Sequence, residues 1–182
     1  LLILAHFMGD FPLQTSWVYH QKNKSLWRGI YHTLGLFLAL IICLLPYLYL
    51  LNIWGVMLLI LFTHFLQDTG KLVILKTNRI PEIWGYFLDQ GSHLFFTLFF
   101  WYIFIAGQNY TPLFGSMIYQ NFPLIAYAIG LILVTYFLSV TRYVIFYAHQ
   151  KEKVPLRRNW MRMALYALVF SGIYWGVLLW GG

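Results

Sequence analysis

Leu61-Phe62-Thr63-His64-Phe65-Leu66-Gln67-Asp68-Thr69-Gly70-Lys71 is the stretch that decides the fold. It lies inside an apolar run from Trp54 to Leu75, which is long enough to cross a bilayer as a helix. On that helix His64 and Asp68 lie one turn apart on the same face, and Lys71 follows about a turn later. Ionisable side chains in a membrane span are costly and usually face the interior of a helix bundle. The stretch therefore predicts a membrane helix that carries a polar site.

The pairing of histidine with aspartate recurs along the chain. His6 and Asp10 repeat the spacing near the first residue, and Asp89 and His93 have it in reverse order. Each aspartate of the chain is four residues from a histidine. The repetition predicts that these pairs act together.

Composition limits the class of protein. Of the 182 residues, 61% are hydrophobic and 9% are charged, whereas soluble domains have about 25% charged residues. We therefore expect residues 1–182 to form a single transmembrane domain. The net charge of +7 does not indicate nucleic-acid binding, because the basic residues lie between apolar segments. Cys43 is the single cysteine, which excludes an internal disulfide and a multi-thiolate metal site.

The apolar segments predict an all-α, polytopic helical bundle. About six transmembrane helices are expected, at residues 1–17, 30–51, 54–75, 83–106, 123–147 and 160–180. Pro12 should end or kink the first helix early. Residues 1–106 carry the histidine and aspartate motifs, and residues 122–182 are expected to be a scaffold hairpin. Because the chain opens at Leu1 without a methionine, we expect that residues precede it.

The loop charges predict the orientation in the membrane. Basic residues cluster in alternate loops, at Lys22, Lys24 and Arg28, at Lys76 and Arg79, and at Lys151, Lys153, Arg157 and Arg158. The positive-inside rule places these loops in the cytoplasm and both termini on the extracytoplasmic side.

An internal repeat relates the first four expected helices. His6-Phe7-x-x-Asp10 aligns with His64-Phe65-x-x-Asp68, and each is followed by a helix with a histidine, His32 or His93. We therefore expect the first two helices and the next two to be parallel copies of one helical hairpin, related by an axis along the membrane normal.

The predicted topology brings the motif residues to similar depths, with each aspartate one turn nearer the cytoplasm than its histidine. The candidate metal ligands are His6, Asp10, His32, His64, Asp68, Asp89 and His93. Imidazole and carboxylate together suit a divalent transition metal such as Zn, Mn or Fe. This set exceeds the four ligands of one tetrahedral zinc and suits two ions with a bridging carboxylate. Gln14, Gln67 and Gln90 are expected to support these ligands by hydrogen bonds.

Two other interpretations remain open at this point. Histidine and aspartate also pair as interhelical polar contacts without a metal, and a proton relay is the third possibility. The distances would separate the first two, because ligands lie at about 2.0–2.2 Å from a shared ion, whereas hydrogen-bonded pairs lie at about 2.7–3.0 Å.

Three segments resemble the motifs of a known family. Ala5-His6-Phe7-Met8-Gly9-Asp10-Phe11-Pro12-Leu13-Gln14 resembles the His-x-x-Gly-Asp-Phe-x-x-Gln signature of a bacterial family of uncharacterised multi-spanning membrane proteins. His64-x-x-x-Asp68 and Leu88-Asp89-Gln90-x-x-His93 look like its second and third motifs. The resemblance covers about residues 1–100, and it implies a multi-pass protein of the bacterial inner membrane. More distantly, the pattern is similar to inner-membrane proteins described as metal-dependent hydrolases.

These observations predict a cytoplasm-facing intramembrane metal site. As an enzyme, the protein is expected to hydrolyse a membrane-borne phosphoester or another anionic lipid, with the metal ions polarising the ester. Asp10, Asp68 and Asp89 would be the catalytic carboxylates, and Lys71 would hold the anionic group. The alternative is a non-catalytic subunit of a larger membrane complex, in which the histidines and aspartates form a structural polar network.

Overall fold

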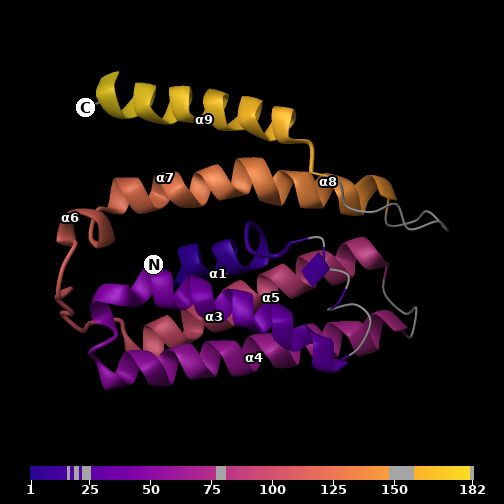
Figure 1. The fold of residues 1–182 in the computed structure, drawn as a ribbon, viewed down its shortest axis with the longest axis horizontal. Helices are drawn as coiled ribbons and strands as arrows, with labels where there is room; N and C mark the ends of the chain where they lie inside the picture. The colour runs from indigo at the N-terminus through magenta and orange to yellow at the C-terminus, as the bar shows by residue number, and fades with distance from the viewer. Residues whose placement is uncertain (16, 19–20, 22–25, 77–80, 148–157, 181–182) are drawn as a thin grey trace.

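The computed structural model describes residues 1–15, 17–18, 21, 26–76, 81–147 and 158–180. All regular elements of this part of the chain are helical, which confirms the all-α fold (Figure 1). The helices are α1 (Leu2–Asp10), α3 (Ile30–Leu44), α4 (Leu51–Lys76), α5 (Glu82–Phe104), α6 (Ser116–Tyr119), α7 (Phe122–Ile132), α8 (Leu138–Tyr147) and α9 (Trp160–Trp180). Short 3-10 turns lie at Leu26–Gly29 and Leu45–Tyr47, and a π-helical turn at Leu133–Phe137 joins α7 to α8.

Four described segments are long and apolar enough to cross a membrane. They are Trp27–Tyr47, Leu51–Ile74, Phe122–Phe146 and Trp160–Trp180. The fourth expected span, α5, is long enough at 23 residues, but Asp89, Gln90 and His93 interrupt its apolar sequence. The first expected segment, residues 1–17, forms a shorter helix in the structure, because α1 has nine residues and ends at Asp10. The early end follows from Pro12, which cannot donate a backbone hydrogen bond.

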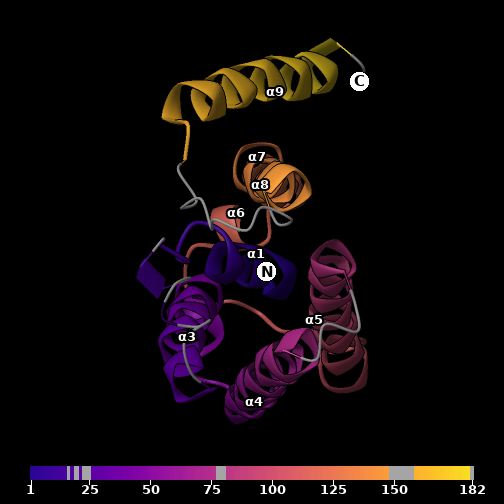
Figure 2. The same ribbon diagram turned by 90° about the vertical axis from the view of Figure 1, so that its right-hand side faces the viewer.

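The four motif-bearing helices form a closed ring of contacts. Helix α1 packs against α3 and α5, and α4 packs against the same two helices. Figure 2 shows α1 near the centre of the molecule, with α3 and α4 below it, α5 to its right, and α7 and α8 above it. A twofold axis that exchanges the two predicted hairpins would map the α1–α3 contact onto the α4–α5 contact, and the α1–α5 contact onto the α3–α4 contact. All four of these contacts are present. The superposition of the hairpins themselves stays a prediction.

The contact between α1 and α3 is unusually close. A Cβ atom built on Gly9 would lie 2.9 Å from the Cα atom of Leu36, a distance at which backbone would have to move. Ala5, Leu36 and Ala39 are completely buried beside this contact. Gly9 therefore lets α1 approach α3 closely enough to bring Asp10 into the bundle.

The C-terminal helices cover one side of the ring. Asn121 caps α7 by accepting a hydrogen bond from the Leu124 amide at 3.0 Å, and Asn159 caps α9 by accepting one from the Arg162 amide at 3.0 Å. The π-helical turn places the Phe137 ring against the ring of Phe11, with centroids 5.5 Å apart. These contacts attach the C-terminal half to α1.

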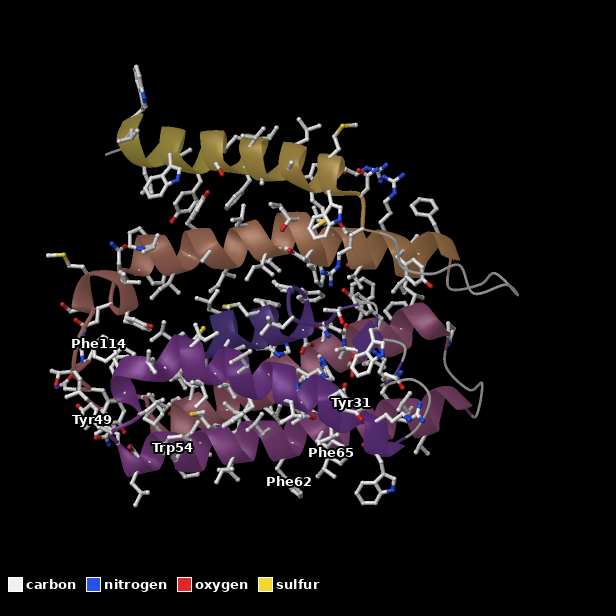
Figure 3. The ribbon with its side chains drawn as sticks, viewed as in Figure 1. Tyr31, Tyr49, Trp54, Phe62, Phe65 and Phe114 are labelled. Carbon is white, nitrogen blue, oxygen red and sulfur yellow. The ribbon has the colours of Figure 1, made fainter. Side chains whose placement is uncertain are left out.

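Aromatic side chains line the outside of the bundle. Figure 3 shows Tyr49, Trp54 and Phe114 toward one end and Phe62 on the outer face of α4, and all four are exposed. Such exposed rings suit the lipid-facing surface and interfacial belts of a membrane protein.

The helix ends that flank the basic segments lie together at one end of the molecule, opposite both termini (Figure 1). This arrangement agrees with the prediction that the basic segments occupy alternate loops at one end of the bundle. Which end faces the cytoplasm stays a prediction. Lys22, Lys24, Arg79, Lys151, Lys153 and Arg157 lie outside the described residues.

Candidate metal centre

All seven predicted ligands converge inside the ring of α1, α3, α4 and α5. Their side chains are buried, with residue exposures between 1% and 6%. The histidine rings are close neighbours, and those of His64 and His93 stack with centroids 4.0 Å apart. The sequence therefore identified a set of residues that the tertiary structure brings together, although their role as metal ligands stays a prediction.

Asp10 directs one carboxylate oxygen at three imidazoles. Its Oδ1 atom lies 3.3 Å from Nε2 of His32, 3.5 Å from Nε2 of His64 and 3.9 Å from Nδ1 of His6. These nitrogens come from three helices, α1, α3 and α4. Asp10 Oδ1 is therefore at the centre of the histidine cluster.

Asp68 uses its two oxygens in different directions. Oδ2 lies 3.7 Å from Nε2 of His32 and 3.6 Å from Nε2 of His64. Oδ1 lies 3.6 Å from Nε2 of His93, and Oδ1 of Asp89 approaches the same nitrogen at 3.3 Å. Asp68 thus connects the Asp10 side of the cluster with the Asp89 side.

The outward-facing atoms of the cluster are held by tight hydrogen bonds. Oδ2 of Asp10 accepts from the Gln90 amide at 2.9 Å, and Oδ2 of Asp89 accepts from Lys71 Nζ at 2.6 Å. On the histidine side, Gln14 Nε2 lies 3.3 Å from Nδ1 of His32, and an amide turned by 180° would accept from that nitrogen instead. Such outer partners fix the orientation of metal-binding side chains.

The contact between His93 and Gln67 determines which nitrogen of His93 carries hydrogen. Nδ1 of His93 lies 2.7 Å from Oε1 of Gln67. With the Gln67 amide placed so that its oxygen faces the ring, Nδ1 donates, and a neutral His93 presents the lone pair of Nε2 to the carboxylates of Asp68 and Asp89. Acceptors that face one another are stabilised when a cation lies between them.

The inward-facing nitrogens lie near carboxylate oxygens but do not form regular hydrogen bonds. Within the described part of the chain, Nε2 of His6, His32, His64 and His93 makes no hydrogen bond, and neither does Oδ1 of Asp10. A buried polar atom without a partner costs about 1–3 kcal/mol. Three groups of these side chains could hold a metal ion: His6 with Asp10 and His64, His32 with His64 and Asp68, and Asp68 with Asp89 and His93. The first and second groups share His64, and the second and third share Asp68.

Arg158 supports the cluster from the C-terminal half of the chain. Its Nη2 atom donates to the carbonyl oxygens of Phe11 at 2.9 Å and Gln14 at 2.6 Å, and its guanidinium lies 5.0 Å from the centre of the Tyr136 ring. Burial lowers the pKa of Arg158, but an arginine stays charged at neutral pH. The sequence assigned Arg158 only to loop charge. No local pattern identifies a partner that is 147 residues away.

Comparison with known families matches residues 1–120 to a family described as "Protein of unknown function (DUF3307)". The matched region contains α1, α3, α4 and α5, and therefore all seven candidate ligands. No curated protein and no solved structure matches the chain. The match fits the expected uncharacterised family, while the resemblance to metal-dependent hydrolases stays a prediction.

Proposed function

The chain belongs to the DUF3307 family, and from that premise we propose that it is a membrane-embedded, metal-dependent hydrolase. In this proposal the His/Asp cluster would hold two divalent ions, with zinc as the best fit, and Asp68 would contribute a ligand to both positions. The substrate is a phosphoester carried by a membrane lipid. The basic segments, and the carboxylates nearer to them, face the cytoplasm of a bacterial cell.

The observation that supports this proposal most strongly is the spacing of the inward-facing atoms. Four ligands at about 2.0–2.2 Å from a tetrahedral ion are separated from one another by about 3.3–3.6 Å. The separations of Asp10 Oδ1 and Asp68 Oδ2 from Nε2 of His32 and His64 are 3.3, 3.5, 3.7 and 3.6 Å. A hydrogen-bonded network would bring charged partners to about 2.7–2.9 Å, and the outer bonds to the carboxylates of Asp89 and Asp10 are comparably short, at 2.6 and 2.9 Å.

The two proposed ion positions differ in their ligands. The inner position has His32, His64 and Asp68, and Asp10 Oδ1 within 3.5 Å of both imidazole nitrogens. The outer position has Asp68, Asp89 and His93. Structural zinc sites usually have four protein ligands, whereas catalytic sites have three and leave one position open. The outer position is therefore the proposed site of reaction.

When bound, the ions would polarise the phosphoryl oxygen and make water a stronger nucleophile near neutral pH. In the overall reaction a water oxygen forms a bond to phosphorus and the bond from phosphorus to the alcohol oxygen breaks. One water proton ends on the released alcohol, and the hydroxyl group remains on the phosphate. Lys71, which touches Asp89 at the outer position, stabilises the negative charge of the phosphoryl group. Asp10, Asp68 and Asp89 hold the ions that this reaction needs.

Elemental analysis combined with a lipid hydrolysis assay tests the proposal. The full chain is purified in mild detergent without chelator, and 31P NMR follows the conversion of the phosphodiester of phosphatidylglycerol vesicles to a phosphomonoester, either phosphatidic acid or glycerol phosphate. We expect about two ions per chain, loss of hydrolysis with a chelator, and recovery when zinc is added back. Protein that contains no stoichiometric metal under gentle preparation would refute the hydrolase proposal. The alternative would then stand, in which the chain is a non-catalytic complex subunit whose histidines and aspartates form a structural polar network.

A further inference from the structure

A cleft lies between α4 and α5 beside the proposed outer ion position. Its volume is about 360 Å³, which is near the lower end of the range of about 300–1,000 Å³ that small-ligand sites occupy. Gln67, Lys71, Asp89 and Ser92 form its polar part. The cleft therefore reaches the His/Asp cluster, because Asp89 Oδ1 lies 3.3 Å from Nε2 of His93.

The remaining lining of the cleft is apolar and faces outward. Ile74 on α4 and Leu88 on α5 line it and are 46% and 61% exposed. Residues Leu51–Ile74 of α4 are long and apolar enough to cross a membrane, so an exposed side chain here would face lipid. Gly70 and Gly85 complete the walls, and a Cβ atom added to Gly70 would meet nothing within 4 Å. The cleft is thus open at the side of the bundle.

The charge in the cleft is suited to an anion. The Lys71 side chain is 24% exposed, and its Nζ atom lies 2.6 Å from Oδ2 of Asp89. With two divalent ions, the three aspartates and Lys71 would sum to a charge of about +2. A phosphodiester carries one negative charge, so a phosphate group that entered the cleft would lower this net charge to about +1 at a depth where uncompensated charge is costly.

We propose that this cleft binds the phosphate headgroup of an anionic glycerophospholipid, which enters sideways from the bilayer between α4 and α5. The phosphate lies against Lys71 at the polar end, and the acyl chains pass over Ile74 and Leu88 into the membrane. The small volume selects a small headgroup such as that of phosphatidylglycerol. This inference rests on the proposed function for its reaction, but the binding itself is measured separately.

The test uses the full chain, as purified, in nanodiscs of phosphatidylcholine with or without phosphatidylglycerol at 4 °C. Native mass spectrometry counts the retained phosphatidylglycerol, and metal content is measured on the same samples. Gly70→Leu fills the cleft, and Lys71→Gln removes its positive charge. Gly55→Leu is the matched control, because Gly55 is on the same helix and also has nothing within 4 Å of an added Cβ atom.

We expect the wild type and Gly55→Leu to retain phosphatidylglycerol in preference to phosphatidylcholine. Gly70→Leu and Lys71→Gln should each lower this retention at least about tenfold, with the metal content of Gly70→Leu unchanged. Equal retention by Gly70→Leu and Gly55→Leu would overturn the lipid site. Full displacement of the lipid by millimolar glycerol 3-phosphate would also overturn it, in favour of a soluble phosphoester. Specific retention in protein that lacks metal would instead contradict the proposed hydrolase and leave the lipid site intact.

Discussion

The Gln90 amide donates a 2.9 Å hydrogen bond to Oδ2 of Asp10, which joins α1 to α5 across eighty residues. Both side chains are buried, Asp10 at 4% and Gln90 at 9% exposure. With Oδ2 held in this way, Oδ1 of Asp10 is directed at His32 and His64. Gln90 therefore sets the orientation of a candidate ligand without itself being one.

Gln90→Leu should weaken metal binding about 10–100-fold, because loss of a hydrogen bond to a ligating carboxylate has effects of this size. The measurement is a competition titration against a chromophoric chelator. Gln108→Leu is the control, since Gln108 is exposed in the segment after α5. Equal affinity in the two variants would contradict the role assigned to Gln90.

The two ion positions should respond differently to single substitutions. Asp89→Asn removes a ligand of the outer position only, so we expect the count to fall from about two ions per chain to about one. Asp68→Asn removes the ligand shared by both positions and should retain fewer ions than Asp89→Asn. Elemental analysis of the two purified variants gives the counts directly. The reverse order of retention would refute Asp68 as the bridge.

Gly9→Ala should destabilise the protein by about 1–3 kcal/mol, because the added Cβ atom overpacks a close helix contact. The atom that it meets is the backbone Cα of Leu36, at 2.9 Å. Gly91→Ala is the matched control, with nothing within 4 Å of its Cβ atom. Thermal unfolding in detergent compares them, and similar melting temperatures would show that α1 is not held as closely as described.

Arg158→Gln should lower metal affinity by roughly tenfold, since the turn at residues 11–14 positions both Asp10 and Gln14. The control is Arg142→Gln, because Arg142 is exposed and its guanidinium lies 5.5 Å from the Phe146 ring centre. Chelator competition measures the affinity, and circular dichroism verifies that both variants are folded. An equally large effect of Arg142→Gln would show that the loss of metal affinity comes from removing a positive charge, and not from losing the hydrogen bonds of Arg158.

Cysteines at positions 109 and 153 should be labelled from opposite sides of the membrane, because the positive-inside rule places the basic segments in the cytoplasm. The background is a Cys43→Ala chain, since Cys43 is the single native cysteine. Impermeant maleimide applied to intact and to opened cells measures the sidedness. Labelling of both positions in intact cells would overturn the predicted orientation.

The spacing along the sequence was sufficient to predict an all-α bundle and, together with the internal repeat that pointed to His32, the members of the cluster. Residues four apart lie on one face of a helix, so each aspartate had to accompany its histidine. The high cost of polar groups in a bilayer then directed these faces inward. Pro12 as the cause of an early helix end was likewise a local property that needs no knowledge of distant residues.

The tertiary structure alone decided how the faces meet. The position of α1 at the centre of the bundle, the shared position of Asp68 and the bond from Arg158 to the carbonyl of Phe11 all depend on contacts between distant segments. Helical periodicity fixes the direction of a side chain around its own axis, but not the rotation and depth of one helix against another. Those are set by side-chain packing, such as the approach of Gly9 to Leu36. For this reason the sequence identified the candidate ligands, while packing between helices determined which of their atoms face one another.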